Sequence, residues 1–420
     1  MKRSYTIVLL IFLIFFVISF ITNILGPIIP DIIKSFNLSL TLAGFLPFAF
    51  FIAYGFMSIP SGMLVERYRE KRIILWAFLL AFLGSILFAT FPNYKVAIFS
   101  LFIIGTGMAM LQVAINPLLR VSGGEEHFAL NSVIAQLVFG GASFLSPHVY
   151  SYLVVNLRTS SNQNNLLFSL LSQVVPDEIS WVSLYWLFTI ITLIMLVFIL
   201  IVKLPKVSLK ADEKTGVWKI HRDLFKNKIV ILYFIGIFAY VGSEQGVANW
   251  ISKFLLDYHG FEPQTTGANT VSYFWGLLTL GCLLGLILLK FVDSRKVLFI
   301  FAGSAIVSFC FAIFGTAKMA LFAFPLTGFC FSVMWSIIFS LALNSLKEHH
   351  GSFSGILCTA IIGGALIPLV IGWVGDLLSL RLGMMIIFLT LGYILSIGFW
   401  SKPLISNKVI KLKKRKTVLN

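Results

Sequence analysis

Apolar runs of about 20 residues recur along almost the whole chain, separated by short polar segments. Each run is long enough to cross a hydrocarbon layer of about 30 Å as an α-helix. A membrane barrel would instead show segments of about ten residues with alternating hydrophobicity. The chain is 59% hydrophobic and 11% charged, whereas soluble proteins carry about 25% charged residues. These features predict an all-α polytopic membrane protein and exclude a soluble enzyme, a secreted disulfide scaffold and a disordered chain.

We predict twelve transmembrane helices, which cover residues 6–33, 41–64, 73–92, 95–119, 128–155, 181–203, 229–256, 266–291, 296–316, 318–346, 352–375 and 382–401. The longest segment expected on the cytoplasmic side, residues 204–228, falls in the middle of the chain and is rich in lysine. The expected domains are therefore an N-terminal bundle (1–203), a cytoplasmic linker (204–228), a C-terminal bundle (229–401) and a basic cytoplasmic tail (402–420).

The net charge of +16 indicates either a nucleic-acid partner or a membrane topology signal. With the N-terminus in the cytoplasm, the inside segments hold 26 of the 32 Lys and Arg residues. The outside loops hold the other six: Lys34, Lys95, Arg158, Lys253, Lys318 and Arg381. Cytoplasmic loops of membrane proteins collect Lys and Arg, so we expect both termini in the cytoplasm and no nucleic-acid partner. The tail is interpreted as a topology signal, with contact to anionic lipid headgroups as the alternative.

A similar motif follows the second and the eighth predicted helix. Residues 62–72 and 285–296 both read as a glycine, an apolar helix end and a tight charged turn. The repetition at corresponding places indicates an internal repeat, which is typical of transporters with two bundles around a central site. We expect the turns to stabilise one conformation through charge contacts with neighbouring helix ends. The candidate gating residues are Gly62, Glu66, Arg67, Asp293 and Arg295.

The first turn resembles the cytoplasmic loop signature of the major facilitator superfamily. Gly62, Leu64, Glu66 and Arg67 fit that signature, and Arg69 stands where its second glycine usually lies. The resemblance implies two pseudo-symmetric bundles of six helices.

Three further stretches resemble the fucose and glucose/galactose porters within that superfamily. They are residues 111–140, with Gln112-Val113-Ala114-Ile115-Asn116-Pro117; residues 240–250; and residues 338–376, with Ile361-Ile362-Gly363-Gly364. This resemblance implies a porter for a hexose or deoxyhexose, such as fucose, glucose or galactose, in the inner membrane of a bacterium. Such porters are usually sugar:cation symporters, driven by a proton or sodium gradient.

The chain departs from the proton-coupled porters at the positions of two acids. Proton-coupled fucose porters carry an acid in helix one and another in helix four, which align here with Gly26 and Gln112. Neither residue can hold a proton, so proton coupling cannot be carried over from the resemblance. Proton coupling through another group, sodium coupling and simple facilitated diffusion stay open.

Acids inside the predicted helices are informative because a charge at the bilayer centre costs at least about 2.5–3.5 kcal/mol. Glu244 is the one acid that falls midway along a predicted helix, whereas Asp31 and Asp376 are assigned with other acids to outer ends. Glu244 is therefore the candidate coupling residue, able to bind a proton or, with amide oxygens, sodium. The structural alternative is a neutral Glu244 hydrogen-bonded to a neighbour such as Gln245.

Amide and aromatic side chains inside the helices match the chemistry of a sugar. Each amide offers an acceptor and two donors to sugar hydroxyls, and aromatic rings stack on the apolar face of a pyranose. Each amide could instead join two helices, at a modest gain of about 0.6 kcal/mol. The candidate substrate-binding residues are Asn23, Gln112, Asn116, Asn131, Gln136, Asn249, Trp250, Asn269 and Tyr273.

Motifs for catalysis are absent from the sequence, which contains neither a GxxxxGK[ST] loop for ATP nor an HExxH metal site. We therefore expect a transporter rather than an enzyme, with no cofactor and no metal centre. Its expected partners are a monosaccharide, a proton or a sodium ion, and the lipid bilayer, and the chain is expected to be a monomer. The alternatives are an exporter of a drug-like or other small organic solute and a non-transporting sugar sensor.

Overall fold

The computed structural model describes residues 5–124, 127–158, 166–205 and 218–404. Within these residues, twelve helical spans are long and apolar enough to cross a membrane. They confirm the predicted all-α fold, with span ends that differ from the prediction by a few residues. The spans are Tyr5–Phe36, Leu40–Tyr68, Glu70–Thr90, Tyr94–Gly123, Leu130–Leu157, Glu178–Ile201, Lys228–His259, Pro263–Phe291, Ser294–Phe314, Ala317–Leu343, His350–Leu377 and Leu380–Trp400.

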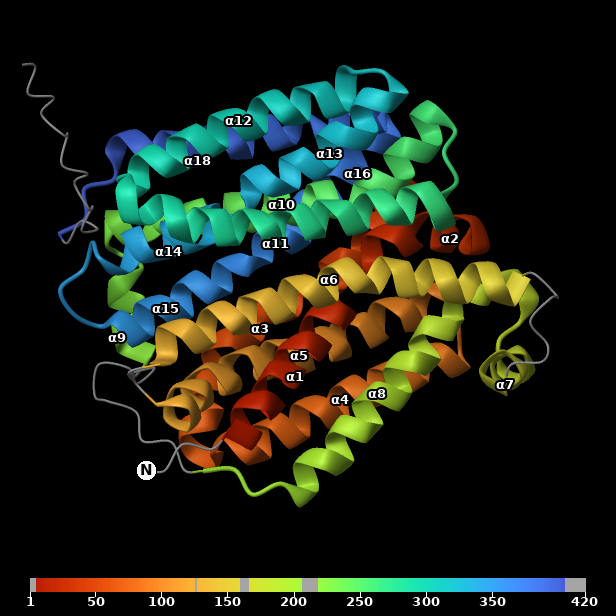
Figure 1. Ribbon diagram of the computed structural model, residues 1–420, viewed down its shortest axis with the longest axis horizontal. Coiled ribbons are helices and arrows are strands. Elements are labelled where there is room, and N and C mark those ends of the chain that lie inside the picture. Colours follow the sequence, from red (N-terminus) through yellow and green to blue (C-terminus); the bar gives the residue numbers. More distant parts are fainter. Residues whose placement is uncertain (1–4, 125–126, 159–165, 206–217, 405–420) are drawn as a thin grey trace, which may run out of the picture.

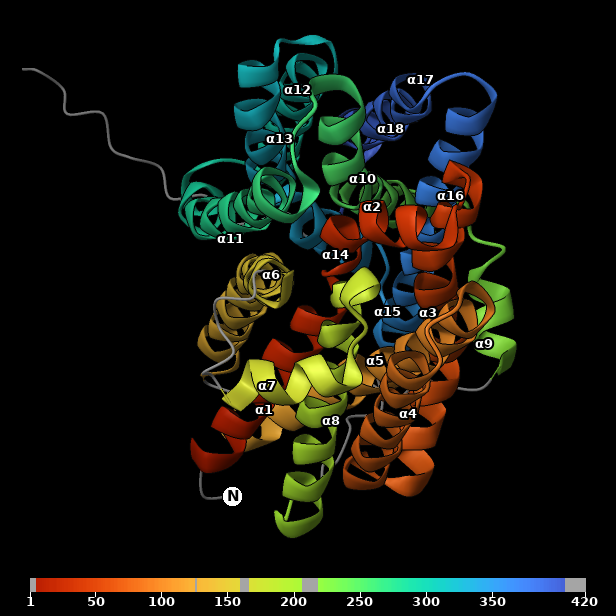
Figure 2. The same ribbon diagram turned by 90° about the vertical axis from the view of Figure 1, so that its right-hand side faces the viewer.

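The first six spans gather in one bundle and the last six in another, one below the other in Figure 1. The first bundle consists of α1 (Tyr5–Thr22), α2 (Leu25–Phe36), α3 (Leu40–Tyr68), α4 (Glu70–Thr90), α5 (Tyr94–Gly123), α6 (Phe128–Arg158), η3 (Asp177–Val182) and α8 (Ser183–Ile201). The second consists of α10 (Lys228–His259), η5 (Pro263–Gly267), α11 (Ala268–Phe291), α12 (Ser294–Phe314), α13 (Ala317–Phe331), α14 (Met334–Leu343), α15 (His350–Thr359), η6 (Ala360–Ile362), α16 (Gly363–Leu377), α17 (Leu380–Met384) and α18 (Ile386–Trp400). Figure 2 shows the two bundles from one end.

Two short helices, α7 (Leu166–Val174) and α9 (Trp218–Leu224), lie outside the spans. Helix α9 occupies part of the predicted linker, of which residues 206–217 lie outside the described residues. The predicted basic tail also lies outside them from residue 405 onward. We name the two ends of the molecule by the orientation expected from Lys and Arg, so α1 begins at the cytoplasmic end and α2 ends at the outer end.

Proline interrupts the first span near its middle. Helix α1 ends at Thr22 and α2 begins at Leu25. Pro27 has no N–H to donate to the carbonyl of Asn23, four residues earlier, so the helical hydrogen-bond ladder loses a bond here. Spans ten and eleven are interrupted as well, between α13 and α14 and at η6. Interrupted helices are a common way to place polar groups near the bilayer midplane in transporters.

The two bundles pack against each other through α3 with α15 and α16, through α6 with α11, and through α2 with α10. In the outer half their backbones come very close. A Cβ atom added at Gly26 would lie 2.2 Å from the carbonyl oxygen of Ala248, and one added at Gly372 would lie 2.4 Å from that of Leu40. Small residues allow this approach of helices from opposite bundles. The outer end is therefore closed in this structure.

Candidate functional site

Five buried polar residues meet where the two bundles join near the middle of the spans, and we call them the polar centre. They are Ser19 on α1, Asn23 at the interruption of the first span, Ser143 on α6, and Gln245 and Asn249 on α10. Each of the five side chains is nearly inaccessible to solvent. The break after Thr22 places Asn23 opposite α10, because the chain there no longer follows one continuous helix.

Hydrogen bonds connect the polar centre across the two bundles. Asn23 Nδ2 donates to Ser143 Oγ at 2.8 Å, and Gln245 Nε2 donates to Asn23 Oδ1 at 3.4 Å. The hydroxyl oxygens of Ser19 and Ser143 lie 2.6 Å apart. On α10, Asn249 Nδ2 donates to the carbonyl oxygen of Gln245 at 2.8 Å. Among these four contacts, the bond between Asn23 and Gln245 is the one that joins the N-terminal bundle to the C-terminal bundle.

The polar centre consists of neutral groups that both donate and accept hydrogen bonds. Such a set can exchange its internal bonds for bonds to a neutral solute rich in hydroxyl groups. Asn23 and Asn249 belong to the predicted binding residues, whereas Ser19 and Ser143 do not. A serine inside an apolar helix gives a weak sequence signal, because its hydroxyl can bond to the carbonyl one turn earlier. Ser143 does so toward Phe139, at 3.2 Å.

Four of the predicted residues lie on α5 and α6. Asn116 and Gln136 are exposed and Gln112 is half-buried, so none of the three lies in the fully buried core. Asn116 Nδ2 donates to the carbonyl oxygen of Gln112 at 3.2 Å. Asn131 lies apart from them, since its amide packs against Gly123 at the cytoplasmic end of α5. The structure thus separates Asn131 from the middle of the spans.

The predicted residues of α10 and α11 have different surroundings. Trp250 is fully buried, and its Nε1 donates to the carbonyl oxygen of Pro368 at 3.1 Å, which ties α10 to α16. Asn269 is the second residue of α11 and lies at the outer end, half-buried. Tyr273 is 52% exposed and lines a cavity of about 310 Å³ between α6 and α11, with Phe144 on the opposite helix. None of these three side chains lies in the polar centre as defined above.

Glu244 lies on α10 and is half-buried. The hydroxyl of Tyr240, one turn earlier on the same helix, donates to Glu244 Oε1 at 2.6 Å. The ring of Tyr240 in turn contacts Trp335 of α14, with 6.1 Å between the ring centroids. The carboxylate therefore has a hydrogen-bond donor from its own bundle, a partner that the sequence did not identify.

The first predicted gating turn is a single residue long. Helix α3 ends at Tyr68 and α4 begins at Glu70, and Arg69 between them has a φ of +70°. That value lies in the left-handed region, where glycine has no steric cost and other residues are rare. This geometry explains why the superfamily signature has a glycine there. Glu66 and Arg67 are exposed beside the turn, and the Arg67 guanidinium lies 5.2 Å from the centre of the Tyr68 ring.

The second predicted gating turn caps a helix. Asp293 Oδ1 accepts hydrogen bonds from the backbone N–H of Arg295 at 2.9 Å and from its Nε at 3.2 Å, at the start of α12. Partial burial acts to raise the pKa of Asp293, but the hydrogen bonds and charge of Arg295 outweigh it and hold the pKa below its usual value. Arg295 Nη1 also donates to the carbonyl oxygen of Ser401, at 3.4 Å, just after α18. This turn thereby joins two helices at the cytoplasmic end.

Asp31 is an acid whose surroundings the sequence did not reveal. It lies on α2 toward the outer end, as expected, but it is only 4% exposed. The hydroxyl of Tyr150 on α6 donates to Asp31 Oδ2, and Gln264 Nε2 on η5 donates to Asp31 Oδ1 at 2.5 Å. An acid near a span end usually faces water, so its position in the sequence gave no sign of burial between the bundles.

Comparisons with known proteins agree with this architecture. A family model described as Major Facilitator Superfamily matches residues 11–360. A glucose/galactose transporter of Brucella abortus is 31% identical over 376 residues, which cover 88% of each chain. The L-fucose-proton symporter of Escherichia coli is 26% identical over 373 residues, covering 83% of this chain and 82% of that one.

Solved structures show the same fold. The E. coli fucose:proton symporter aligns with a TM-score of 0.68 and 22% identity, covering 96% of this chain and 100% of that one. A D-xylose-proton symporter aligns with a TM-score of 0.72 and 14% identity, covering 97% of this chain and 100% of that one. The family model covers most of the chain, and the twelve helical spans and the positive φ at Arg69 agree with it. The chain therefore belongs to the Major Facilitator Superfamily.

Proposed function

We propose that this protein is a secondary transporter that moves a monosaccharide across the bacterial inner membrane by alternating access. The observation that carries the proposal is the polar centre, a buried set of neutral amides and hydroxyls at the junction of the two bundles. Buried polar groups are costly unless they are hydrogen-bonded, so a solute that enters this site must offer donors and acceptors in return. A sugar offers both on each hydroxyl group.

Sugar binding at this place can be coupled to movement of the bundles. The bond of 3.4 Å between Asn23 and Gln245 is long, and it breaks when the two bundles separate. A sugar hydroxyl bound between the two amides replaces that bond in the open state and bridges the bundles in the closed state. Gln112, Asn116 and Gln136, which lie outside the fully buried core, are proposed to supply further hydrogen bonds from the N-terminal bundle.

Hexoses and deoxyhexoses are the proposed substrate class. Support comes from the relatives named glucose/galactose transporter and L-fucose-proton symporter, which align over most of this chain. An exporter of apolar, drug-like solutes is the competing function, and the cavity beside Tyr273 between α6 and α11 is the feature that favours it. A sugar sensor is the third possibility; it would bind sugar without moving it.

The decisive experiment is uptake of radiolabelled glucose, galactose and fucose into proteoliposomes that contain the purified protein. Sodium and pH gradients are imposed separately, so that the coupling ion is identified by the gradient that drives accumulation. Saturable uptake of at least one sugar supports the proposal. Binding without uptake would indicate a sensor, and absence of both would refute the assignment to sugars.

We further propose that Glu244 couples sugar movement to a cation. A symporter requires a site whose affinity for the ion differs between the empty and sugar-loaded states. The side chain of Gln245, a member of the polar centre, interacts with the Glu244 carboxylate, and Tyr240 donates a hydrogen bond to the same carboxylate. A change at Gln245 on sugar binding therefore alters the surroundings of the carboxylate.

Glu244→Gln should abolish uphill accumulation of sugar while preserving exchange of sugar between preloaded vesicles and medium. Glu262→Gln is the matched control, because Glu262 is exposed at the outer end, before η5. If the Glu244 variant still concentrates sugar against its gradient, Glu244 is not the coupling residue.

The proposed orientation has both termini in the cytoplasm, and the proposed oligomeric state is a monomer. The orientation follows from the distribution of Lys and Arg, and the even number of spans in the described residues supports two termini on the same side of the membrane. The monomer is an expectation of the sequence analysis. Protease protection of tags placed at either end, in right-side-out vesicles, tests the orientation. Light scattering of the detergent-solubilised protein tests the oligomeric state.

A further inference from the structure

Two carboxylates at the outer end each accept hydrogen bonds from the opposite bundle. Asp31 of the N-terminal bundle accepts from Gln264 of the C-terminal bundle at 2.5 Å. Asp376 on α16 of the C-terminal bundle accepts from the backbone N–H groups of Leu40 and Thr41 at 2.8 and 2.7 Å. The arrangement is reciprocal, because each bundle contributes one acid and supplies the hydrogen-bond donors for the acid of the other bundle.

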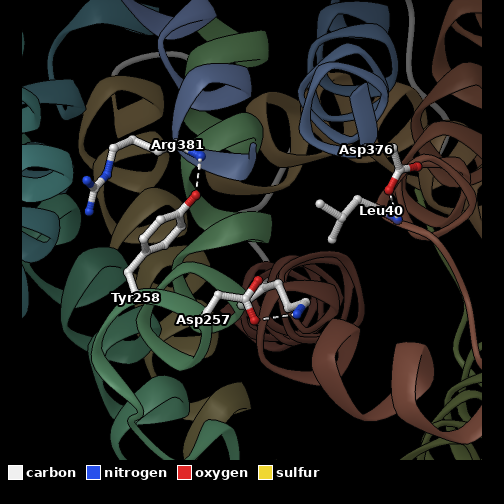
Figure 3. A network of polar contacts seen from close by, with 6 residues as sticks. Leu40, Asp257, Tyr258, Asp376 and Arg381 are labelled. Carbon is white, nitrogen blue, oxygen red and sulfur yellow. Dashed lines mark hydrogen bonds and ion pairs between the residues drawn. The ribbon is translucent and has the colours of Figure 1, made fainter. Parts of the chain in front are cut away.

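Asp376 lies at the N-terminus of α3. Leu40 and Thr41 are the first residues of that helix, whose first N–H groups have no partner within the helix. A negative charge is stabilised there by the helix dipole as well. Figure 3 shows Asp376 and Leu40 facing each other across adjoining helices of the two bundles. The acid of one bundle thus caps a helix of the other.

We propose that Asp31 and Asp376 are positioning residues that hold the outer end closed and so set the ratio of outward-closed to outward-open transporter. The inference rests on the proposed function, since it assumes that the outer end opens during transport. Opening separates each carboxylate from its donors in the other bundle. Neither acid was among the binding, coupling or gating residues predicted from the sequence.

The two acids differ in exposure, and this difference ranks their effects. Asp31 is buried, so its hydrogen bonds form where water does not compete for them, whereas Asp376 is exposed. Hydrogen bonds to ionised groups are stronger than those between neutral groups, and more so when they are buried. Asp31→Asn should therefore shift the equilibrium toward the outward-open state by about tenfold, and Asp376→Asn should shift it by less.

The chain offers a matched control at the same end. Asp257 on α10 forms an ion pair of 2.5 Å with Lys253, one turn earlier on the same helix. Figure 3 also shows Tyr258 beside Arg381, a contact in which the backbone N–H of Arg381 donates to the Tyr258 hydroxyl at 3.0 Å within the C-terminal bundle. Asp257→Asn removes a carboxylate from the outer end without breaking a bond between the bundles.

The opening can be measured with a reporter cysteine at Ala248. This residue is buried on α10, where its backbone meets Gly26 of the opposite bundle. The four native cysteines are first replaced by serine, and Ala248→Cys is introduced in the full-length chain. The rate of labelling by a membrane-impermeant maleimide, added from the outside to intact cells, then reports how often the outer end opens.

We expect labelling to rise about tenfold in Asp31→Asn, to rise by less in Asp376→Asn, and to stay unchanged in Asp257→Asn. A larger outward-open fraction should also lower the KM for external sugar, because more of the transporter can bind from outside. The same shift should lower Vmax. A variant that merely damages folding would lower Vmax without either change. Asp31→Glu, which keeps the carboxylate, should restore much of the wild-type labelling rate.

Leu40→Pro is a second, independent variant. Proline removes the N–H that donates to Asp376, yet it is favoured at the first position of a helix. Ser39 before it already has an extended backbone, with φ −71° and ψ 165°, which suits a residue that precedes proline. Raised labelling in this variant supports the proposal without any change to an acid.

Wild-type labelling in Asp31→Asn, Asp376→Asn and Leu40→Pro would overturn the proposal. The labelling assay contains no sugar, so its result is separate from the uptake experiment. If the proposed sugar is wrong but the outer contacts act as described, labelling still responds to the variants while sugar uptake is absent.

Discussion

Gly26→Ala tests directly whether the outer end opens and closes between the two bundles. The added methyl group would lie 2.2 Å from the carbonyl oxygen of Ala248, 3.1 Å from its carbonyl carbon and 3.3 Å from the Cα of Asn249. These atoms belong to the backbone of α10 in the opposite bundle, so rotation of a side chain cannot relieve the contact. The methyl group is therefore tolerated only when α2 and α10 move apart.

The size of the effect follows from that geometry. Overpacking by a methyl group in a well-packed region typically costs about 1–3 kcal/mol. Here the cost falls on the outward-closed state alone, so the ratio of open to closed transporter should rise about 5- to 150-fold. Alanine also favours a helix over glycine by about 0.8–1.0 kcal/mol. That gain acts in both states and cancels in the ratio.

Distances between spin labels at Lys34→Cys and Glu262→Cys measure the separation, because both residues are exposed at the outer end, on opposite bundles. We expect a longer-distance population to appear in Gly26→Ala. Gly392→Ala in α18 is the control, since a Cβ there would meet nothing within 4 Å. Distance distributions for Gly26→Ala that match both wild type and the control would refute the reasoning.

Three further predictions concern binding, turnover and stability. Asn116→Ala and Asn249→Ala should each raise the KM for sugar by about two- to tenfold, since each hydrogen bond contributes about 0.5–1.5 kcal/mol net; an unchanged KM in both, measured by radiolabelled uptake, would exclude them from the site. Glu66→Gln or Arg67→Ala should lower Vmax and leave sugar affinity intact, and equal losses of both would indicate a folding role. Asp293→Ala should destabilise the protein at neutral pH by about 0.5–2 kcal/mol through loss of the cap on α12. Because the pKa of Asp293 is lowered, this difference should persist at neutral pH and shrink as the pH falls through that lowered pKa, which thermal unfolding at several pH values would show.

The span pattern shows why the fold could be predicted from the sequence. A helix is the only structure that satisfies all backbone hydrogen bonds within one apolar segment of the bilayer, so each apolar run fixes one element. The turn at Arg69 was predicted from the repeated charged motif and from its resemblance to the superfamily signature, and the structure has there the positive φ that a signature glycine would favour. Glu244 was likewise singled out by the cost of placing a charge within a span. Its role in coupling stays a prediction.

The sequence did not determine which polar side chains face one another. Asn23 and Asn249 meet through Gln245, whereas Trp250, next in the chain to Asn249, turns into the contact between α10 and α16. Adjacent residues on a helix point in different directions, and which direction meets the other bundle depends on how the helices are rotated and packed. That rotation is not encoded in hydropathy.

Local chemistry therefore determined the number, length and type of the elements, because the bilayer constrains each helix separately. Only the tertiary structure decided the contacts between distant parts of the chain. Asp31 is an unremarkable acid near the end of a span in the sequence, but α6 and η5 bury its carboxylate. Asp376 caps a helix that begins more than 330 residues earlier in the chain. Such contacts depend on the close packing of two bundles, a property that belongs to the assembled molecule and to neither segment alone.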